Sequence, residues 1–572
     1  MMTLNKDTMY KINVSDREYR DYVIVDSKTL KKTDITVNAP LHKLFTQDIF
    51  TINSDSSIKI EHSSVRSMST IPAVLVLEGN KMFGKYKNRF LYKCLPDDRR
   101  LPVFLVPYKI KNKFNKKLTN KYITFEFREW INKHPLGVIS QTLGDVSDLP
   151  SFYEYQLYCK SLYASIQNFN KQTMRRLKTK SEEEFVDHVM STYALEDRRE
   201  TYDIITIDPV GSKDFDDAFS IKKNNGNYTL SIYISNVSIW MDTLDLWESF
   251  SNRIATIYLP DRKRPMLPTI LSDALCSLQE DRSRFAFTLD ITIDATTYEI
   301  TESKFLNTAI KVRKNLRYDT VEQETDTTYL KALGLIKILN RKFKYSDSIT
   351  TSHEFIAYIM ILMNYISAKE LKKRKIGIYR SAKYNTSFNP PENISPQVQK
   401  FLKMWNSTGG SYVKYENISG HEILDLDAYV HITSPIRRLV DLLNIIKFQE
   451  ALGIFTNQKS QEFYVRWTND EAFEYINTTM RSIRKVQNDC SLLNLCSSDE
   501  DIMNREHNAF IFDKIVRNDS LFQYMVYIHD IGLVNRVTSR HDIPTYSKKK
   551  CKLYLFTDEI RLKTKIRISL NL

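Results

Sequence analysis

Residues 207–218 read I-D-P-V-G-S-K-D-F-D-D-A and place four carboxylates within ten positions: Asp208, Asp214, Asp216 and Asp217. Anions this close repel one another, and a hard divalent cation with oxygen ligands removes the repulsion. The stretch therefore predicts a site for Mg²⁺, with Mn²⁺ as an equivalent ion. Two such ions about 3.5–4 Å apart would suit hydrolysis of a phosphodiester. The alternatives are a solvated acidic loop and a calcium loop, although the spacing lacks the glycine and glutamate of the EF-hand.

The local pattern around these acids predicts two strands joined by a loop. Residues 203–208 are β-branched and favour a strand, which a proline and a glycine then end. Asn-Asn-Gly at 224–226, between two apolar runs, predicts a β-hairpin. Successive residues of a flat strand face opposite sides. Asp216 and Asp217 can therefore share a site only if the loop curls between them.

Composition places the chain among soluble globular proteins of several domains. It has 572 residues, of which 42% are hydrophobic and 27% are charged. An excess of 83 basic over 69 acidic side chains gives a net charge of +14. Because an acidic cluster is present as well, this balance indicates a basic surface elsewhere, and polyphosphates are the usual partners of such surfaces. A compositional bias toward Lys, Asn and Ile is the alternative explanation.

Several classes of protein find no support in the chain. The six cysteines are scattered without zinc spacing, which indicates a reduced, intracellular and cytoplasmic location, with a nuclear or virion location left open. The longest apolar run, residues 355–363, is too short to span a bilayer and predicts a buried helix. Motifs for nucleotide hydrolysis, serine catalysis and dinucleotide binding are missing.

The texture of the chain predicts a multidomain α+β protein in which small β-barrels flank a mixed α/β core. Short strands with polar turns precede the core and follow it, whereas helical periods connect and complete it. The predicted parts are a barrel over 1–70, a second barrel over 71–150, a helical connector over 151–200, the core domain over 201–500 and a third barrel over 503–572.

The second predicted barrel carries aromatic residues among basic ones: Phe83, Tyr86 and Phe90 alternate with lysines and an arginine. This arrangement is typical of sheets that stack the bases of a single strand on rings while cations follow its backbone. Alternatively, the rings fill the barrel. Both interpretations can hold for alternate residues.

Two further stretches belong with the acidic loop. The first, A-T-I-Y-L-P-D-R-K-R-P, presents Tyr258 ahead of basic residues, where the ring could stack on a base or pack in a core. The second reads Y-V-H-I-T-S-P-I-R-R-L-V-D-L-L over residues 429–443. It predicts an N-cap at Thr433 and Ser434, with Pro435 in the first helical turn. A helix start beside Arg437 predicts a phosphate site, and a capped structural helix with surface arginines is the alternative.

Together the three stretches resemble the ribonuclease II (RNB) family, which includes bacterial exoribonucleases and the catalytic subunit of the eukaryotic exosome. The resemblance covers residues 200–450 and the order of the flanking parts. It implies two cold-shock-like OB folds before the RNB catalytic domain and one OB-fold RNA-binding domain after it. Residues 152–158 are similar to the exosome branch. The stretch before them is too short for that branch's endonuclease domain, so we expect no endonuclease activity.

The resemblance also implies roles for individual residues. Asp208, Asp214, Asp216 and Asp217 match the metal-site aspartates, and loss of Asp216 is expected to stop cleavage while RNA still binds. Asp216, Asp217 and Arg437 are the implied catalytic residues. Tyr258 matches the aromatic that stacks on the 3′ end, and Arg437, with Arg438 beside it, matches the arginine that holds a phosphate. Glu354 and Asn364 fit supporting positions.

Four positions depart from the family pattern. Leu439 replaces an aromatic residue and Ile445 replaces a histidine, and we expect both changes to affect packing more than chemistry. Gln487 aligns with a glutamate of some bacterial members, and Ile376 aligns with their second stacking aromatic. The clamp on the terminal nucleotides is therefore expected to be looser here.

The resemblance implies a processive 3′→5′ exoribonuclease that hydrolyses single-stranded RNA to nucleoside 5′-monophosphates with two Mg²⁺ ions. We expect single-stranded RNA as the partner, no membrane, and a monomer unless the chain joins a larger RNA-decay assembly. Two other functions stay open. One is a catalytically silent RNA-binding protein of the same fold, and the other is a metal-dependent DNA nuclease, which only contacts to the 2′-hydroxyl would separate from a ribonuclease.

Overall fold

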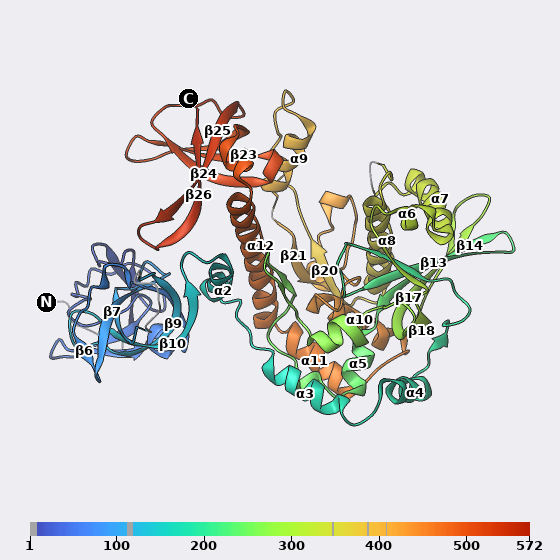
Figure 1. Cartoon of the computed structure of the whole chain (residues 1–572), viewed down its shortest axis with the longest axis horizontal. Helices are drawn as coiled ribbons and strands as arrows, with labels where there is room; N and C mark the ends of the chain where they lie inside the picture. Colours follow the sequence, from blue (N-terminus) through green and yellow to red (C-terminus); the bar gives the residue numbers. More distant parts are fainter. Residues whose placement is uncertain (1–7, 111–117, 346–347, 386–387, 408, 572) are drawn as a thin grey trace. The chain divides into compact units, whose positions relative to one another are not determined.

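A computed structural model describes residues 8–110, 118–345, 348–385, 388–407 and 409–571 (Figure 1). The chain forms two compact units. The first unit comprises Met1–Tyr163, Leu259–Asp261 and Lys485–Leu572, and the second comprises Ala164–Tyr258 and Arg262–Arg484. The two ends of the chain therefore belong to the same unit, although more than 300 residues separate them.

The first unit is built from three sheets. The first sheet has the order β2-β1-β3-β4, the second β5-β9-β10-β8-β7-β6, and the third β24-β23-β22-β25-β26. Their strands are β1 (Tyr10–Val14), β2 (Tyr22–Asp26), β3 (Ile49–Ile52), β4 (Ile58–His62), β5 (Ile71–Leu75), β6 (Lys85–Tyr86), β7 (Arg89–Pro96), β8 (Phe104–Tyr108), β9 (Lys121–Glu129), β10 (Leu136–Asp145), β22 (His507–Val516), β23 (Phe522–Ile528), β24 (Leu533–Ser539), β25 (Lys548–Asp558) and β26 (Lys563–Leu570). The helices are α1 (Ser64–Ser67), α2 (Leu149–Cys159) and α13 (Glu500–Asn504).

Alternation of apolar and polar residues gives each of these sheets one buried face. In β1, Tyr10, Ile12 and Val14 are buried while the residues between them are partly exposed, as the two-residue period of a strand requires. The third sheet closes into a barrel, because the Asn535 side chain of β24 donates a hydrogen bond to the Ile566 carbonyl oxygen of β26 (3.1 Å).

The second unit is built on a seven-stranded sheet of order β11-β18-β17-β14-β13-β12-β19. Its strands are β11 (Glu196–Asp197), β12 (Ile205–Asp208), β13 (Asp217–Asn224), β14 (Asn227–Ser235), β17 (Ser283–Asp294), β18 (Ile300–Lys311) and β19 (Lys314–Arg317). Two small ribbons add β15 (Ile257–Tyr258) to β16 (Lys263–Arg264) and β20 (Ile378–Ser381) to β21 (Ser411–Lys414). The helices are α3 (Gln167–Leu177), α4 (Glu182–Thr192), α5 (Val237–Thr243), α6 (Val321–Thr325), α7 (Thr327–Lys342), α8 (Ser352–Lys373), α9 (Pro396–Trp405), α10 (Leu439–Leu452) and α11 (Gln458–Thr468), and α12 (Asp470–Ser498) runs from this unit into the first.

The predicted hairpin is confirmed at the centre of this sheet. Strands β13 and β14 pair in antiparallel register from Asp217↔Ile234 to Asn224↔Asn227. The two turn residues, Asn225 and Gly226, have φ values of +42° and +84°. Positive φ at both positions is the requirement of a type I′ turn, which asparagine and glycine meet at low cost.

Helices cover the seven-stranded sheet and bury its apolar side chains. Ile232 and Leu289 of the sheet share a core with residues of α7, α8 and α10. The apolar run over 355–363 lies inside α8, where Phe355 is fully buried, so the predicted buried helix is confirmed. Within the described residues, no helix is both long enough and apolar enough to cross a membrane.

The predicted fold class, a multidomain α+β chain with small β-structures on both sides of a mixed core, is confirmed. The individual domain boundaries stay predictions. None of the six cysteines, all of which lie in the described part of the chain, forms a disulfide.

Candidate functional site

The sheet of the second unit delivers the acidic residues to one place. Strand β12 ends at Asp208, and after a loop β13 begins at Asp217. The loop turns at once, because the Ser212 amide donates to the Pro209 carbonyl oxygen (3.1 Å). Asp216 is tied to the sheet through its carbonyl oxygen, which accepts the Ser235 amide (2.8 Å). The loop therefore curls just before the strand, as sharing of a site by neighbouring aspartates requires.

Asp216 is the most enclosed of the four acids, with 4% of its surface exposed. One carboxylate oxygen accepts the Ile436 backbone amide (2.9 Å), and the other accepts Arg437 Nε (3.1 Å). Arg437 also donates to Ser434 Oγ (2.8 Å). The acidic loop and the T-S-P-I-R-R segment, about 220 residues apart in sequence, thus meet in a single charged pair.

Asp214 lies in a second set of contacts. Its carboxylate accepts Lys263 Nζ (2.8 Å) and the Tyr258 hydroxyl (3.2 Å). Lys263 also contacts Asp273 (2.9 Å). The hydroxyl of Tyr258 is therefore anchored at the acidic loop, while 42% of the residue remains exposed to solvent.

Burial and mutual repulsion raise the pKa of three of the aspartates. For Asp208, burial is the largest cause, followed by the charges of Asp216 and Asp214, and its pKa is raised to about 7. Burial and then Asp208 raise the pKa of Asp217 to about 7. Burial also raises the pKa of Asp216 to about 7, although Arg437 opposes the shift. Because their charges shift one another's pKa, the three carboxyl groups lie close together.

The predicted helix start at Thr433 and Ser434 is wrong. Helix α10 begins at Leu439 with Arg438 as its N-cap residue, and the Ser434–Arg437 segment forms a separate turn closed by the Arg438 amide on the Ser434 carbonyl oxygen (2.9 Å). The backbone of Arg438 pairs instead with Ala255. The turn directs its Ile436 amide at Asp216, so this amide is occupied and cannot bind a phosphate at the same time.

Three residues that the sequence analysis missed, or assigned only a supporting place, hold this turn. Asp441 accepts the Ser434 amide (2.7 Å) and Arg438 (2.9 Å). Asn364 of α8 donates to the Tyr429 hydroxyl (3.0 Å) and accepts the Ile432 amide (2.9 Å). Asn444 of α10 donates to the carbonyl oxygens of Ile378 and His431. Asparagine and aspartate inside apolar helices were the available signal for these roles.

Tyr318 was also missed. Its amide donates to the Asp208 carbonyl oxygen (3.1 Å), and its ring stacks on His353 with centroids 3.8 Å apart. Burial, followed by the charges of Asp217 and Asp208, raises its pKa. Tyr318 is therefore an aromatic neighbour of the acidic site, and no motif singled it out.

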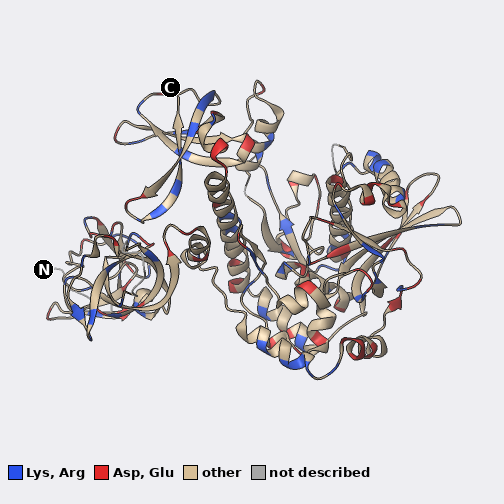
Figure 2. Cartoon of the chain, in the orientation of Figure 1, with Lys and Arg blue, Asp and Glu red and all other residues tan. Residues whose placement is uncertain are grey.

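The aromatic residues predicted in the second barrel lie on β6 and β7 of the first unit and in the turn before them. Lys85 lies over the ring of Phe90 (4.9 Å), Lys87 over Tyr86 (5.6 Å) and Lys93 over Phe83 (5.1 Å). Phe90 is 42% exposed, whereas Tyr92 on the same strand is buried in the core. Figure 2 shows basic residues on these strands and on the C-terminal barrel. The three rings are surface residues, and their binding of RNA stays a prediction.

The remaining predicted residues occupy structural places. Leu439 and Ile445 are buried in apolar cores, and their expected effect on packing more than on chemistry stays a prediction. Glu354 forms a capping box with Thr351 at the start of α8. Ile376 packs against the core of the second unit, and Gln487 belongs to the first unit.

The chemistry of the donor set fits a divalent cation. Asp208 keeps a buried carboxylate oxygen without a hydrogen-bond partner among the described residues, and hard cations take carboxylate ligands of this kind. As they stand, however, no three His, Cys, Asp or Glu residues in the described part of the chain are arranged to hold a metal ion. Arg437 and Lys263 occupy the oxygens of Asp216 and Asp214 instead.

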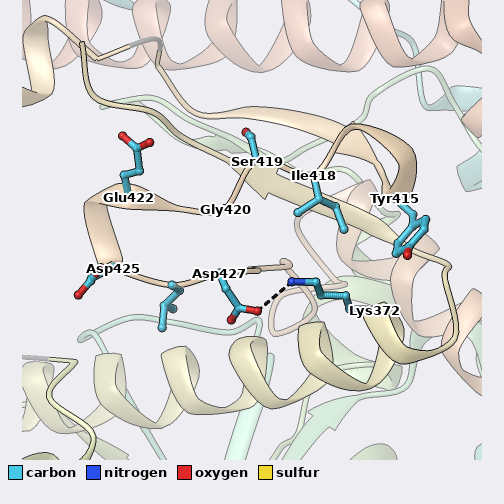
Figure 3. A pocket seen from close by; sticks show the side chains of 9 residues that line it. Lys372, Tyr415, Ile418, Ser419, Gly420, Glu422, Asp425 and Asp427 are labelled. Carbon is cyan, nitrogen blue, oxygen red and sulfur yellow. Dashed lines mark hydrogen bonds and ion pairs between the residues drawn. The ribbon is translucent and has the colours of Figure 1, made fainter. Parts of the chain in front are cut away.

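A pocket of about 560 Å³ lies elsewhere in the second unit (Figure 3). It is lined by Lys372 at the end of α8 and by residues of the 415–427 segment, and Lys372 forms an ion pair with Asp427 (2.9 Å). None of the predicted site residues lines it. We therefore do not assign this pocket to the acidic site.

The fold and the acidic loop define a multidomain α+β protein with aspartates at the ends of strands β12 and β13. The model of the RNB domain matches residues 196–332, which include all four aspartates and Tyr258. This segment of the chain is similar to the RNB domain, and the match covers less than half of the chain.

Two curated relatives extend the match. DIS3-like exonuclease 2 of Schizosaccharomyces pombe is 28% identical over 247 residues, which is 40% of this chain and 25% of that protein. Ribonuclease R of Chlamydia trachomatis is 26% identical over 326 residues, which is 44% of this chain and 46% of that protein. The chain thus matches less than half of the length of these relatives.

Solved structures share the fold at low identity. Mycoplasma genitalium RNase R in complex with ribose methylated single-stranded RNA superimposes with a TM-score of 0.67 at 16% identity, covering 98% of this chain and all of that one. Yeast Ssd1, described as a pseudonuclease, gives a TM-score of 0.59 at 14% identity, covering 92% of this chain and 78% of that one. Both likenesses concern the fold alone.

Proposed function

We propose that this protein is a processive 3′→5′ exoribonuclease that hydrolyses single-stranded RNA to nucleoside 5′-monophosphates. One observation carries the proposal: Asp208, Asp216 and Asp217 lie close enough to affect one another's pKa, and Asp216 among them contacts Arg437. Carboxylates with a pKa near 7 and a guanidinium in contact suit a reaction that must hold both cations and a phosphate. The match of residues 196–332 to the RNB domain supports the same reaction.

Asp208, Asp214, Asp216 and Asp217 would hold Mg²⁺ or Mn²⁺, two ions in our proposal. When bound, these ions would supply a water of lowered pKa and neutralise charge that develops on the phosphate. The chain's own groups have complementary tasks. Arg437 is in contact with Asp216 and is 42% exposed at its side chain, so it can exchange this carboxylate for a phosphate. Tyr258, anchored to Asp214, presents its ring for stacking on the terminal base.

The test uses the purified full chain with 5′-labelled single-stranded RNA and Mg²⁺. The expected products are mononucleotides and a short labelled remnant. Asp216→Asn should bind the RNA and leave it whole, with a loss of about 10²-fold or more in rate. The matched control is Asp281→Asn, an exposed aspartate of the same unit with a positive φ that asparagine tolerates, and it should cleave like the wild type. Internal cuts, or equal activity on single-stranded DNA, would overturn the proposal.

The second candidate is an RNA-binding protein without turnover. The ion pairs of Arg437 with Asp216 and of Lys263 with Asp214 favour it, since cations would have to displace both. The fold likeness to a pseudonuclease agrees with this candidate. It predicts RNA that remains intact with the wild-type chain at any concentration of Mg²⁺ or Mn²⁺.

A further inference from the structure

Three arginines lie near a tyrosine–histidine pair, of which Tyr412 is buried and His431 is half-buried. The Tyr412 hydroxyl lies 2.8 Å from His431 Nδ1. The guanidinium of Arg380 lies over the ring of Tyr412 (5.0 Å). Arg438 and Arg484 act on the same ring, since their charges oppose the rise in pKa that burial gives Tyr412. Arg380 of β20 therefore contacts the Tyr412 ring, and Arg438 at the start of α10 and Arg484 of α12 lie within electrostatic reach of it.

The backbone leaves room for this arrangement. Gly410 lies directly against the guanidinium of Arg380, and a Cβ atom there would come within 2.3–2.5 Å of it. Any side chain at this position would force the guanidinium out of its present place. The amide of Arg380 is also held, because it donates to the Tyr429 carbonyl oxygen (2.7 Å). Arg380 is thus placed by contacts on both of its sides.

The positive charges of this group exceed its negative ones. Arg438 is paired with the buried Asp441, and its Nε is buried without a partner among the described residues. For Arg380 and Arg484, the described part of the chain offers no carboxylate partner. His431 adds no charge of its own, since burial and then the charges of Arg438 and Arg380 hold its pKa well below the ordinary range. Two guanidinium charges are left for an external anion.

We propose that Arg380, Arg438 and Arg484 form a second phosphate subsite, which binds a phosphodiester of the RNA strand next to the one held by Arg437. This inference rests on the proposed RNA substrate, although not on its hydrolysis. Planar guanidinium groups match phosphate oxygens in paired hydrogen bonds. The proposed subsite lies next to the acidic site because Arg438 directly follows Arg437 in the chain. The Cα atoms of two consecutive residues lie about 3.8 Å apart. One strand can therefore contact both.

The test measures binding of single-stranded RNA to the full chain in EDTA between 50 and 500 mM salt. The logarithm of the RNA affinity falls linearly with the logarithm of the salt concentration, and removing one phosphate-binding arginine should make this slope shallower by about 0.7. The ratio of wild-type to variant affinity should therefore fall about fivefold across this range. We expect this result for Arg484→Gln and for Arg380→Gln. Arg380→Lys, which keeps the charge and removes the planar fork, should retain the slope with weaker affinity.

Arg481→Gln is the matched control, because Arg481 is an exposed arginine of the same helix that contacts Thr478. It should bind like the wild type. Arg484 is exposed, so its replacement should leave the melting temperature unchanged. The subsite would be overturned if Arg484→Gln and Arg380→Gln both kept the wild-type dependence of RNA affinity on salt. If Arg380→Gln then lowered only the melting temperature, Arg380 would be a packing residue. Failure of the wild type to cleave RNA would refute the proposed function alone, because this measurement needs no cleavage.

Discussion

Ionisation of Asp208, Asp216 and Asp217 at neutral pH destabilises the folded protein, and other interactions of the fold must offset this cost. Each is at least partly buried, and each has a pKa raised to about 7, with burial as the main cause. A carboxyl group in water would ionise near pH 4. The fold therefore resists ionisation of these groups at neutral pH, as functional sites commonly do. Replacing one of them should relieve part of this cost.

We expect Asp208→Asn to stabilise the metal-free protein at pH 8 more than at pH 5. The folded carboxyl keeps its proton between about pH 4 and 7 while the unfolded one releases it, so wild-type stability falls as the pH rises through this window. Above pH 7 the whole cost is present, on the order of 1–4 kcal/mol. Asparagine does not ionise and avoids this cost. Thermal unfolding in EDTA at both pH values measures the difference.

The control for this experiment is Asp281→Asn, whose exposed side chain should shift stability equally little at pH 5 and pH 8. A decrease in stability of Asp208→Asn that is the same at both pH values would contradict the prediction. Such a result would mean that the interactions made by the wild-type carboxylate outweigh the relieved repulsion.

At this scale the sequence was a good guide to residue identity and a poor one to contacts. The four aspartates, Tyr258 and Arg437 could be selected because their residue types suit one chemistry. The partners Lys263 and Asn444 could not, since a lysine in a basic loop and an asparagine in an apolar helix have many ordinary uses. Only the structure shows that Lys263 contacts Asp214, whereas Asn444 contacts the carbonyl oxygens of Ile378 and His431.

Among the elements, the turn before α10 is where local rules failed. Thr, Ser and Pro in succession are a common helix start. Here the Ser434 amide is accepted by Asp441, seven residues later, and the Ile436 amide by Asp216. Such long-range partners compete with helical hydrogen bonds and delay the helix until Leu439. The β13–β14 hairpin was predictable because its turn residues meet a purely local requirement.

Asn364 links α8 to this turn, and we expect Asn364→Ala to weaken the second unit. The change leaves the Ile432 amide and the Tyr429 hydroxyl without their buried partner. A buried polar group that loses its partner costs about 1–3 kcal/mol. Because Ile432 precedes the Ser434–Arg437 turn, RNA hydrolysis should fall as well. Urea unfolding and the rate of hydrolysis measure the two effects.

Tyr429→Phe provides the graded comparison. It removes the hydroxyl contact and keeps the bond from the Ile432 amide to Asn364. The decrease in stability should therefore be smaller than in Asn364→Ala, and hydrolysis should stay closer to the wild type. Equal decreases in the two variants would show that the amide contact does not hold the turn.

For the whole molecule, the order of parts along the chain differs from their grouping in space. The small barrels at both ends of the sequence could be predicted from the local pattern of short strands and polar turns. Their membership of one compact unit could not, because it depends on contacts across more than 460 residues, such as the ion pair of Lys563 with Asp97 (2.8 Å). Both side chains are largely buried, at 9% and 14% exposed. Local periodicity carries no information on partners this distant.

The whole chain carries a net charge of +14, and rings of β6 and β7 in the first unit lie under lysines, so we expect this unit to contact RNA separately from the acidic site. We expect Phe90→Ala to weaken binding of single-stranded RNA by about 1–3 kcal/mol, because an exposed ring under a lysine is a stacking surface for a base. The rate at saturating RNA should stay unchanged, since the acids are untouched. Met82→Ala, an exposed apolar residue of the same segment, is the control that should bind normally. Anisotropy with labelled RNA measures affinity, and single-turnover hydrolysis measures the rate. Equal decreases of affinity in both variants would mean that bulk, and not an aromatic face, is what the RNA contacts there.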